Sequence, residues 1–455
     1  MDEAVKNDIM SYSPTISHYR REHAPNVLYL PTDLTCQAMY DSFHDKRLKQ
    51  SLESCSYSFY NKKLNKMNIR FTKLGHELCE RCREAEIHMK LANHVVQTTG
   101  ESDFLEEGYP EADRCADSSA DDEEESSVNP PEDCVKCLQW QEHKNVAIRS
   151  RCEYDRDKTM FNGLAVSVDL QKVIQLPRME GFKEVIFSRR IIAMNETFAP
   201  LGGQKKGPTH AVVWNEIISG RKACDIISSF TQNLLVNKDQ EHILYWLDNC
   251  SSQNKNWDLM LHMILIVNSS MISTRDVTFK YLESGHTFMS ADAFHAAVER
   301  RMRLFNKGEI PTYPDFVNCI KQANGDPEPI VTSMEYNDFF EPTFHFKPSV
   351  ISRLKDRPKL ANIKTVKFSR GSYEFHYRND FSTEWKHCSV FTNKQLKQIR
   401  KNSFDFKLTL KYREACTGIE KSRKDFILRK LCSLMPAGKR TYWQDLPEVE
   451  VAEEF

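Results

Sequence analysis

The sequence predicts an α/β domain between about residues 159 and 325, in which a mixed sheet is flanked by helices. Two observations predict it. Short apolar segments with strand-like alternation recur along this region, and segments with apolar residues at helical spacing separate the later ones. Strand patterns that alternate with helix patterns are typical of a sheet whose later strands are parallel.

The strands are expected in a definite order. The first occupies residues 164–170, which read LAVSVDL, and residues 183–195 alternate in a way suited to the second and third strands. After a Gly-rich turn, residues 209–216 form another strand. The next helix is predicted because Ile227 and Phe230 recur at helical spacing.

Two further strand and helix pairs complete the domain. They are strand 241–248 with helix 257–267, and strand 276–283 with the helix that opens at Ser290. Three strands followed by three pairs of strand and helix is the order of the ribonuclease-H-like fold. The sequence therefore predicts that fold class.

Acidic residues fall at the positions where a two-metal site needs them. Asp169 and Asp248 end two strands that lie side by side in such a sheet, and Asp292 begins the last helix. Two Mg2+ or Mn2+ ions about 4 Å apart need shared carboxylates to clamp the attacking and leaving oxygens of a phosphodiester. Asp225, on the intervening helix, is expected to add a fourth carboxylate. Glu299 is the alternative third acid if Asp292 only caps its helix.

Polar residues near these acids are candidates for substrate contact. Gln253, Asn254 and Lys255 follow Asp248 in a loop that precedes a helix N-terminus, where an anion such as a phosphate is favoured. Local capping of that turn by Asn249 and Ser251 is the alternative. His286 could form a hydrogen bond to a phosphate or orient a carboxylate, and a purely structural role is the alternative.

Two cysteine pairs share the spacing C-x2-C-x5-H: Cys79 and Cys82 with His88, and Cys134 and Cys137 with His143. Thiolates two residues apart can reach one metal from a tight turn, and two such pairs complete tetrahedral zinc. We expect one structural zinc held by the four cysteines, or by three of them with a histidine. Two unrelated reduced pairs are the alternative. A closed site has no open position for substrate, so this zinc is expected to support folding only.

The regions outside the central domain differ strongly in charge. Residues 1–74 are expected to be mostly helical, and residues 75–158 form the zinc-binding region. Within the latter, residues 101–133 hold fourteen Asp/Glu and one Arg, which predicts a disordered insertion. This insertion is either a solvated linker or a segment that recruits a protein partner.

Residues 326–455 are expected to form a small, basic α+β domain, with strands at 363–369 and 373–377 and a closing helix at 424–435. Between residues 351 and 440 there are 23 Lys/Arg against 8 Asp/Glu. A basic region of this size favours a polyanionic partner, and a solvated face is the alternative.

No membrane partner is expected. The longest apolar run, residues 259–267, is interrupted by His262 and is far shorter than the roughly 18 residues that a membrane span needs. Fourteen cysteines among 455 residues are too few for a disulfide scaffold. We therefore expect a soluble intracellular protein.

Three strings carry a family resemblance: SVDLQKV around Asp169, LDNCSSQNKNW around Asp248 and ESGHTFMSADAFHAAVE around Asp292. They resemble a widespread, largely uncharacterised group of transposable-element-derived animal proteins with a ribonuclease-H-like DDE integrase domain. The similarity extends back through residues 151–157, both cysteine pairs, the SYSFYNKK string and residues 16–19.

The resemblance implies common descent with a transposase-like protein. It implies DNA as the partner, Mg2+-dependent cleavage or strand transfer as the activity, and the nucleus as the location, with the cytoplasm as a further possibility. A homo-oligomer is compatible with it. Two other functions stay open: a co-opted, inactive nuclear protein that binds DNA or chromatin, and a zinc-dependent scaffold for protein interactions.

Overall fold

The computed structural model describes residues 1–11, 28–30, 36–49, 52–67, 69–71, 79–92, 134–179, 181–201, 207–250, 253–323, 327–342, 357–401 and 405–449. The acidic insertion expected at 101–133 and the family motif at 16–19 lie outside these residues. The chain forms two compact units, residues 1–77 and residues 78–455. Each unit has a hydrophobic core of its own.

The first unit is mostly helical. Its elements are α1 (Asp2–Ser11), β1 (Leu28–Leu30), α2 (Cys36–Lys49), α3 (Tyr57–Lys66) and β2 (Ile69–Phe71). Its core contains Val5 of α1, Phe43 of α2 and Tyr60 of α3. The side chain of Ser56 caps α3 by accepting a hydrogen bond from the backbone N of Phe59. All the candidate site residues belong to the second unit.

The second unit is built on a ten-stranded mixed sheet with the strand order β13-β12-β11-β8-β7-β3-β5-β6-β9, and β4 pairs with β5. The strands are β3 (Leu164–Leu170), β4 (Ile174–Leu176), β5 (Ile191–Pro200), β6 (His210–Asn215), β7 (His242–Leu247), β8 (Asp276–Tyr281), β9 (Ile330–Ser333), β11 (Thr365–Ser369), β12 (Glu374–Arg378) and β13 (Lys386–Ser389). Strand β3 is parallel to β7 and antiparallel to β5, and β7 is parallel to β8. This order is compatible with the predicted ribonuclease-H-like fold.

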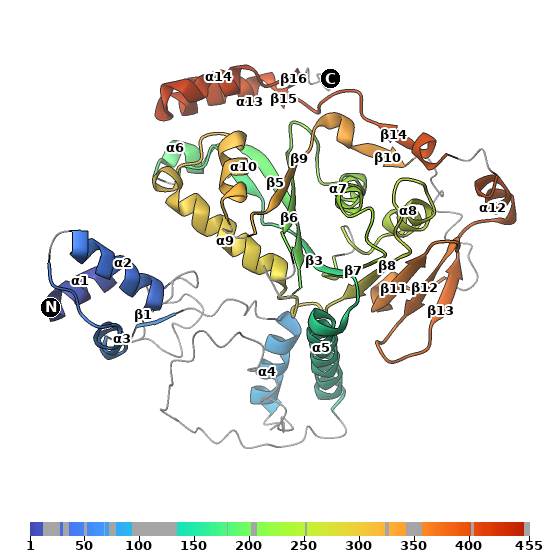
Figure 1. Cartoon of the computed structure of the whole chain (residues 1–455), viewed down its shortest axis with the longest axis horizontal. Helices are drawn as coiled ribbons and strands as arrows, with labels where there is room; N and C mark the ends of the chain where they lie inside the picture. The colour runs from blue at the N-terminus through green and yellow to red at the C-terminus, as the bar shows by residue number, and fades with distance from the viewer. Residues whose placement is uncertain are drawn as a thin grey trace. The chain divides into compact units, whose positions relative to one another are not determined.

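Helices cover both faces of this sheet (Figure 1). On one face lie α7 (Ala223–Val236) and α8 (Trp257–Val267), whose buried residues share a core with Val166 and Tyr245. On the other lie α9 (Ser290–Leu304) and α10 (Tyr313–Lys321), which pack with Ala193 and Val213 of β5 and β6. Successive strand residues point to opposite faces, so both cores draw on the same strands. The predicted α/β class with a mixed sheet flanked by helices is confirmed.

A pair of helices precedes the sheet. Helix α4 (Glu80–Ala92) lies beside α5 (Val135–Met160), which leads into β3 (Figure 1). Tyr154 of α5 packs edge-on against Trp246 of β7. One turn further along, Asp157 accepts hydrogen bonds from the Trp246 indole at 2.9 Å and from Lys280 Nζ at 2.7 Å. These contacts fix α5 against the sheet.

The residues after 326 do not form a separate domain, and that prediction is wrong. Strand β9 pairs with β6, and β11 pairs with β8, so the expected C-terminal strands continue the central sheet. The physical reason is that β8 would otherwise leave a row of unpaired backbone groups at the sheet edge. Smaller elements complete this part: β10 (Phe340–Pro342), α12 (Asn393–Ile399), β14 (Leu410–Tyr412), β15 (Ile419–Glu420), α13 (Lys421–Phe426), α14 (Arg440–Gln444) and β16 (Glu448–Val449).

Two sequence-based assignments differ in detail. The segment 183–195, expected to supply two strands, begins with a single helical turn, α6 (Lys183–Ile186), and β5 starts only at Ile191. A short apolar run cannot show whether its period is two or 3.6, which explains the difference. The predicted helix at 424–435 is α13 followed by a π-helical turn, Ile427–Leu431, and a short 3-10 turn.

Candidate active site and metal centres

The predicted first two acids lie side by side. Val168 of β3 is paired in parallel register with Leu247 of β7, and the next residues along the two strands are Asp169 and Asp248. Both strands are apolar up to that point because each is covered on both faces. Their carboxylates therefore emerge together at one edge of the sheet.

The third predicted acid lies close to the first. Asp292 is in the first turn of α9, and the ligand atoms of Asp169, Asp292 and His295 all lie within 4.8 Å of one another. His295 Nδ1 is 3.6 Å from Asp169 Oδ2. Burial lowers the pKa of His295 to about 3, so the ring is neutral at physiological pH.

The start of α9 is fixed by hydrogen bonds. Asp292 Oδ2 accepts one from the backbone N of Met289 at 2.7 Å, so this acid also caps its own helix. The Tyr154 hydroxyl accepts one from the backbone N of Ser290, and Ser167 Oγ accepts one from the backbone N of Ala291, both at 2.9 Å. Residues of α5 and β3 thus position the helix that carries Asp292.

Glu196 is a further acid at this site, and sequence reasoning missed it. It lies on β5 opposite Leu170, beside the end of β3, and only 1% of its surface is exposed. Burial raises its pKa well above the usual value, and the charges of Asp169 and Asp248 raise it further. The available sequence signal was the run of three polar residues, Asn195, Glu196 and Thr197, inside an otherwise apolar strand. Asp169, Glu196, Asp248 and Asp292 are called the acidic group below.

Asp225 and Glu299 do not join the acidic group. Asp225 accepts a hydrogen bond from the backbone N of Lys222 at the start of α7, and its Oδ1 lies 2.6 Å from Arg413 Nη2. Glu299 is paired with Arg178 at 2.9 Å. The predicted role of Asp225 as a fourth catalytic carboxylate does not fit these contacts, because its oxygens are used in helix capping and in an ion pair with the partly buried Arg413.

The loop after Asp248 is held mainly by internal contacts. Asn254 is buried and donates a hydrogen bond from Nδ2 to Asp248 Oδ1 at 2.7 Å. Lys255 is also buried, and its Nζ lies 2.6 Å from Asn249 Oδ1 and 4.3 Å from the centre of the Tyr281 ring. Burial, with the nearby charge of Lys364, lowers the pKa of Lys255 to about 7. The predicted phosphate contact by Lys255 does not fit this inward position.

Gln253 is half-buried at the start of the same loop, where its backbone N donates to the carbonyl of Cys250. The helix that follows is capped by Asn256, whose side chain accepts a hydrogen bond from the backbone N of Leu259 at 2.9 Å. The cap is thus Asn256 and not Asn249 or Ser251, the residues expected to cap this turn. The side chain of Asn249 instead donates to the carbonyl of Leu282, and Ser251 lies outside the described residues. Asn254 supports Asp248 directly, which is a positioning contact.

The cysteine and histidine residues form two separate groups instead of one. The first contains Cys79, Cys82, His143 and His286, and the second contains His88, Cys134 and Cys137. In each group the ligand atoms lie within 4.8 Å of one another. The expected site of four cysteines is thus not the arrangement found. The two C-x2-C pairs lie at the starts of two neighbouring helices, where each pair meets histidines from other segments.

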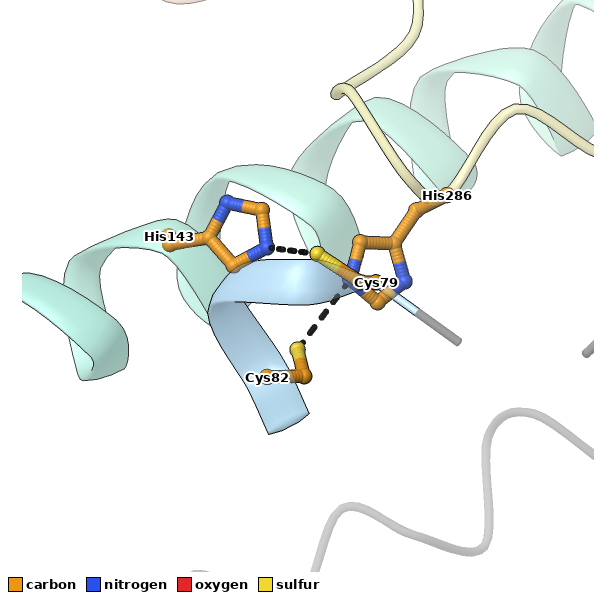
Figure 2. A group of neighbouring side chains, drawn as sticks. All are labelled: Cys79, Cys82, His143 and His286. Atoms are coloured by element: carbon orange, nitrogen blue, oxygen red, sulfur yellow. Dashed lines mark hydrogen bonds between the residues drawn. The ribbon is translucent and has the colours of Figure 1, made fainter. Parts of the chain in front are cut away.

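The first group converges from three segments (Figure 2). Cys79 and Cys82 lie at the start of α4, His143 comes from α5, and His286 comes from the loop between β8 and α9. Cys79 Sγ is 3.1 Å from His143 Nε2, and Cys82 Sγ is 3.5 Å from His286 Nε2. His286, predicted as a substrate contact, therefore belongs to this group, in agreement with its structural interpretation.

The second group is formed by the helix pair alone. His88 Nε2 of α4 is 3.2 Å from Cys134 Sγ, which lies at the start of α5, and Cys137 is buried one turn further on. Hydrogen bonds from backbone groups near Cys137 lower the pKa of the Cys134 thiol. A lowered thiol pKa favours the thiolate, which is the form that binds metals.

Comparison with known proteins gives one match. The family model with the description "Domain of unknown function (DUF7869)" matches residues 223–382. The comparisons with curated proteins and with solved structures found no match. The matched segment begins at α7 and runs through β12, and it contains Asp248 and Asp292 but neither Asp169 nor Glu196. No helix within the described ranges is both long enough and apolar enough to cross a membrane.

Proposed function

We propose that this chain is a transposase-like or integrase-like enzyme that cleaves or joins phosphodiester bonds in DNA with two divalent metal ions. The observation that carries the proposal is the parallel register of β3 and β7, which places Asp169 and Asp248 at the ends of neighbouring strands. The ligand atoms of Asp169, Asp292 and His295 also lie within 4.8 Å of one another. This arrangement on a ribonuclease-H-like strand order matches the needs of two-metal chemistry. A nuclear location is part of the same proposal.

The acidic group fits Mg2+ or Mn2+ by its donor chemistry. Carboxylate oxygens are the hard ligands that these ions prefer. Glu196 is a second observation in favour of a bound cation. It is almost fully buried, and its Oε2 has no hydrogen-bond partner among the described residues. A buried carboxyl beside two other acids is costly unless a cation is shared between them. Asp169, Asp248 and Asp292 would hold the ions, and Glu196 would support them.

The bound ions would supply Lewis-acid stabilisation of the attacking and leaving oxygens. The chain supplies the positioning. Asn254 orients the Asp248 carboxylate through a 2.7 Å hydrogen bond, and Asp292 is fixed by the capped start of α9. Because these contacts are made by the chain itself, they preorganise the two carboxylates for the reaction.

A DNA partner is supported by the charge of the C-terminal part. Helix α12 exposes Lys394 and Lys397 in its short length, and the exposed Arg400 and Lys401 follow it. Such a cluster favours phosphate contacts that are independent of base sequence and sensitive to salt.

A second candidate is a DNA-binding protein that does not cut. The observation in its favour is that Asp292 Oδ2 is already engaged with the backbone N of Met289. If capping is the only role of Asp292, the site would hold two strand-end acids and no third one from α9.

Nicking of supercoiled DNA by the purified chain, with and without Mg2+ or Mn2+, tests the proposal. Asp248→Asn keeps the shape of the side chain and removes its charge, and we expect it to slow cleavage by about a hundredfold or more, which is about 3 kcal/mol of transition-state stabilisation. Asp258→Asn is the matched control, because Asp258 is exposed in the first turn of α8. Equal DNA binding by all three proteins without cleavage by any of them would favour the second candidate.

A further inference from the structure

The distances in the first cysteine and histidine group match a tetrahedral metal site. With Zn–S of about 2.3 Å and Zn–N of about 2.0 to 2.1 Å, sulfur and nitrogen ligands on a tetrahedron are separated by about 3.5 Å. The two pairs in the structure lie at 3.1 Å for Cys79 with His143 and 3.5 Å for Cys82 with His286. Two thiolates with two imidazoles are a ligand set that selects zinc.

The contacts around this group support a metal site as well. His143 Nδ1 lies 3.1 Å from Glu283 Oε1, and Glu283 also forms an ion pair with Lys364. Metal-bound histidines commonly use their second ring nitrogen in this way, because the carboxylate fixes the tautomer and leaves the other nitrogen for the metal. Cys79 and His143 are both buried.

The loop that carries His286 passes unusually close to Cys79. Gly285 has a φ of +79°, and a Cβ at this position would lie 2.7 Å from Cys79 Sγ. Glycine is therefore required both by the backbone conformation and by the space. This close approach is what allows His286, the next residue, to reach Cys82.

We propose that Cys79, Cys82, His143 and His286 bind one zinc ion, which fastens the loop between β8 and α9 to the pair of helices α4 and α5. The site is closed by four protein ligands and has no position for substrate. The zinc ion would instead position the start of α9. His286 lies six residues before Asp292, so the ion holds the segment that leads into this helix. The proposal stands whether or not the acidic group cuts DNA.

Zinc content of the full chain is the test, measured by mass spectrometry of metals after exhaustive dialysis. We expect His286→Ala and Cys82→Ser each to lower the bound zinc by one equivalent relative to the wild type. Thr287→Ala is the matched control, because it changes the same loop without touching a ligand, and it should keep the zinc. Cys134→Ser alters only the second group and should also keep this ion.

A second variant guards against simple misfolding of the alanine variant. In the Co2+-substituted protein, His286→Cys keeps a fourth ligand and should strengthen the thiolate-to-metal charge-transfer absorption. A single site of four cysteines would leave both the zinc content of His286→Ala and the spectrum of His286→Cys unchanged. Either of those results, or a wild-type chain that holds no zinc, would overturn the proposal.

Discussion

His295 Nδ1 lies 3.6 Å from Asp169 Oδ2, so helix α9 meets the end of strand β3 at the acidic group. The ring is neutral at physiological pH, because burial lowers its pKa to about 3. His295 therefore brings α9 close to Asp169 without adding a positive charge. Asp292 lies three residues before His295 on the same helix, and its ligand atoms also lie within 4.8 Å of those of Asp169.

Asp225 is predicted to matter for stability and not for metal binding. Its carboxylate caps α7 and is paired with Arg413, and its side chain is almost fully buried. Asp225→Ala should lower the free energy of unfolding by about 3 kcal/mol, because it leaves a partly buried Arg413 without this partner. Urea denaturation measures the change. A loss below about 1 kcal/mol would show that the ion pair and cap contribute little.

Replacement of Glu196, unlike that of Asp225, should stabilise the fold when no metal is bound. Its carboxyl is buried beside Asp169 and Asp248, and the pKa of Glu196 is raised by burial and by those charges. In buffer without divalent cations, Glu196→Gln should raise the free energy of unfolding by about 1 to 2 kcal/mol, because the amide cannot carry the buried negative charge that Asp169 and Asp248 repel. Added Mg2+ should stabilise the wild type more than this variant. A variant that is less stable in metal-free buffer would contradict this assignment.

Alanine replacements of Gly285 and Gly371 distinguish the cost of a positive φ from the cost of a steric clash. Both have positive φ, at +79° and +86°, but a Cβ on Gly371 meets nothing within 4 Å, whereas one on Gly285 meets Cys79. Gly371→Ala should therefore cost only about 1 kcal/mol, the conformational penalty. Gly285→Ala should cost clearly more and should also weaken zinc retention. Thermal unfolding with zinc analysis of both variants makes the comparison, and equal losses would argue against the close approach.

Buried histidines predict that the fold is sensitive to acid. Burial lowers the pKa of His210 to about 4 and that of His262 to about 3, from an ordinary value of 6.5. Between these values and pH 6.5 the unfolded chain binds more protons than the folded chain, so stability falls as the pH drops through that window. Each histidine contributes up to about 1.4 kcal/mol per pH unit. In His262→Gln the slope between pH 6 and pH 4.5 should be smaller than in the wild type; an unchanged slope would exclude His262 as a cause.

The sequence predicted the parts of the fold that depend on local periodicity. Strand 164–170 and helix 257–267 have the predicted bounds, because each is an apolar segment with clear ends. The pairing of β11 with β8 could not be predicted, since an antiparallel edge is fixed by tertiary contacts and not by pattern.

The sequence likewise predicted some residues of the candidate site and missed others. Asp169 and Asp248 were identified because strand-end acids on neighbouring parallel strands must meet. Glu196 was missed because the register of β5 against β3 decides which of its residues faces the acids. The cysteine spacing identified the four cysteines, His88 and His143, but not their division into two groups. His286 joins Cys82 only through a loop that lies 204 residues away in the sequence.

Mn2+ binding shows whether the acidic group is a divalent metal centre. The electron paramagnetic resonance signal of free Mn2+ can be followed during titration of the zinc-loaded protein, without any knowledge of the DNA substrate. We predict that the wild type and Asp258→Asn bind Mn2+ that Mg2+ displaces, and that Asp169→Asn and Asp248→Asn lose this binding. Equal Mn2+ binding by all four proteins, or none by the wild type, would show that the acidic group is not a divalent metal centre.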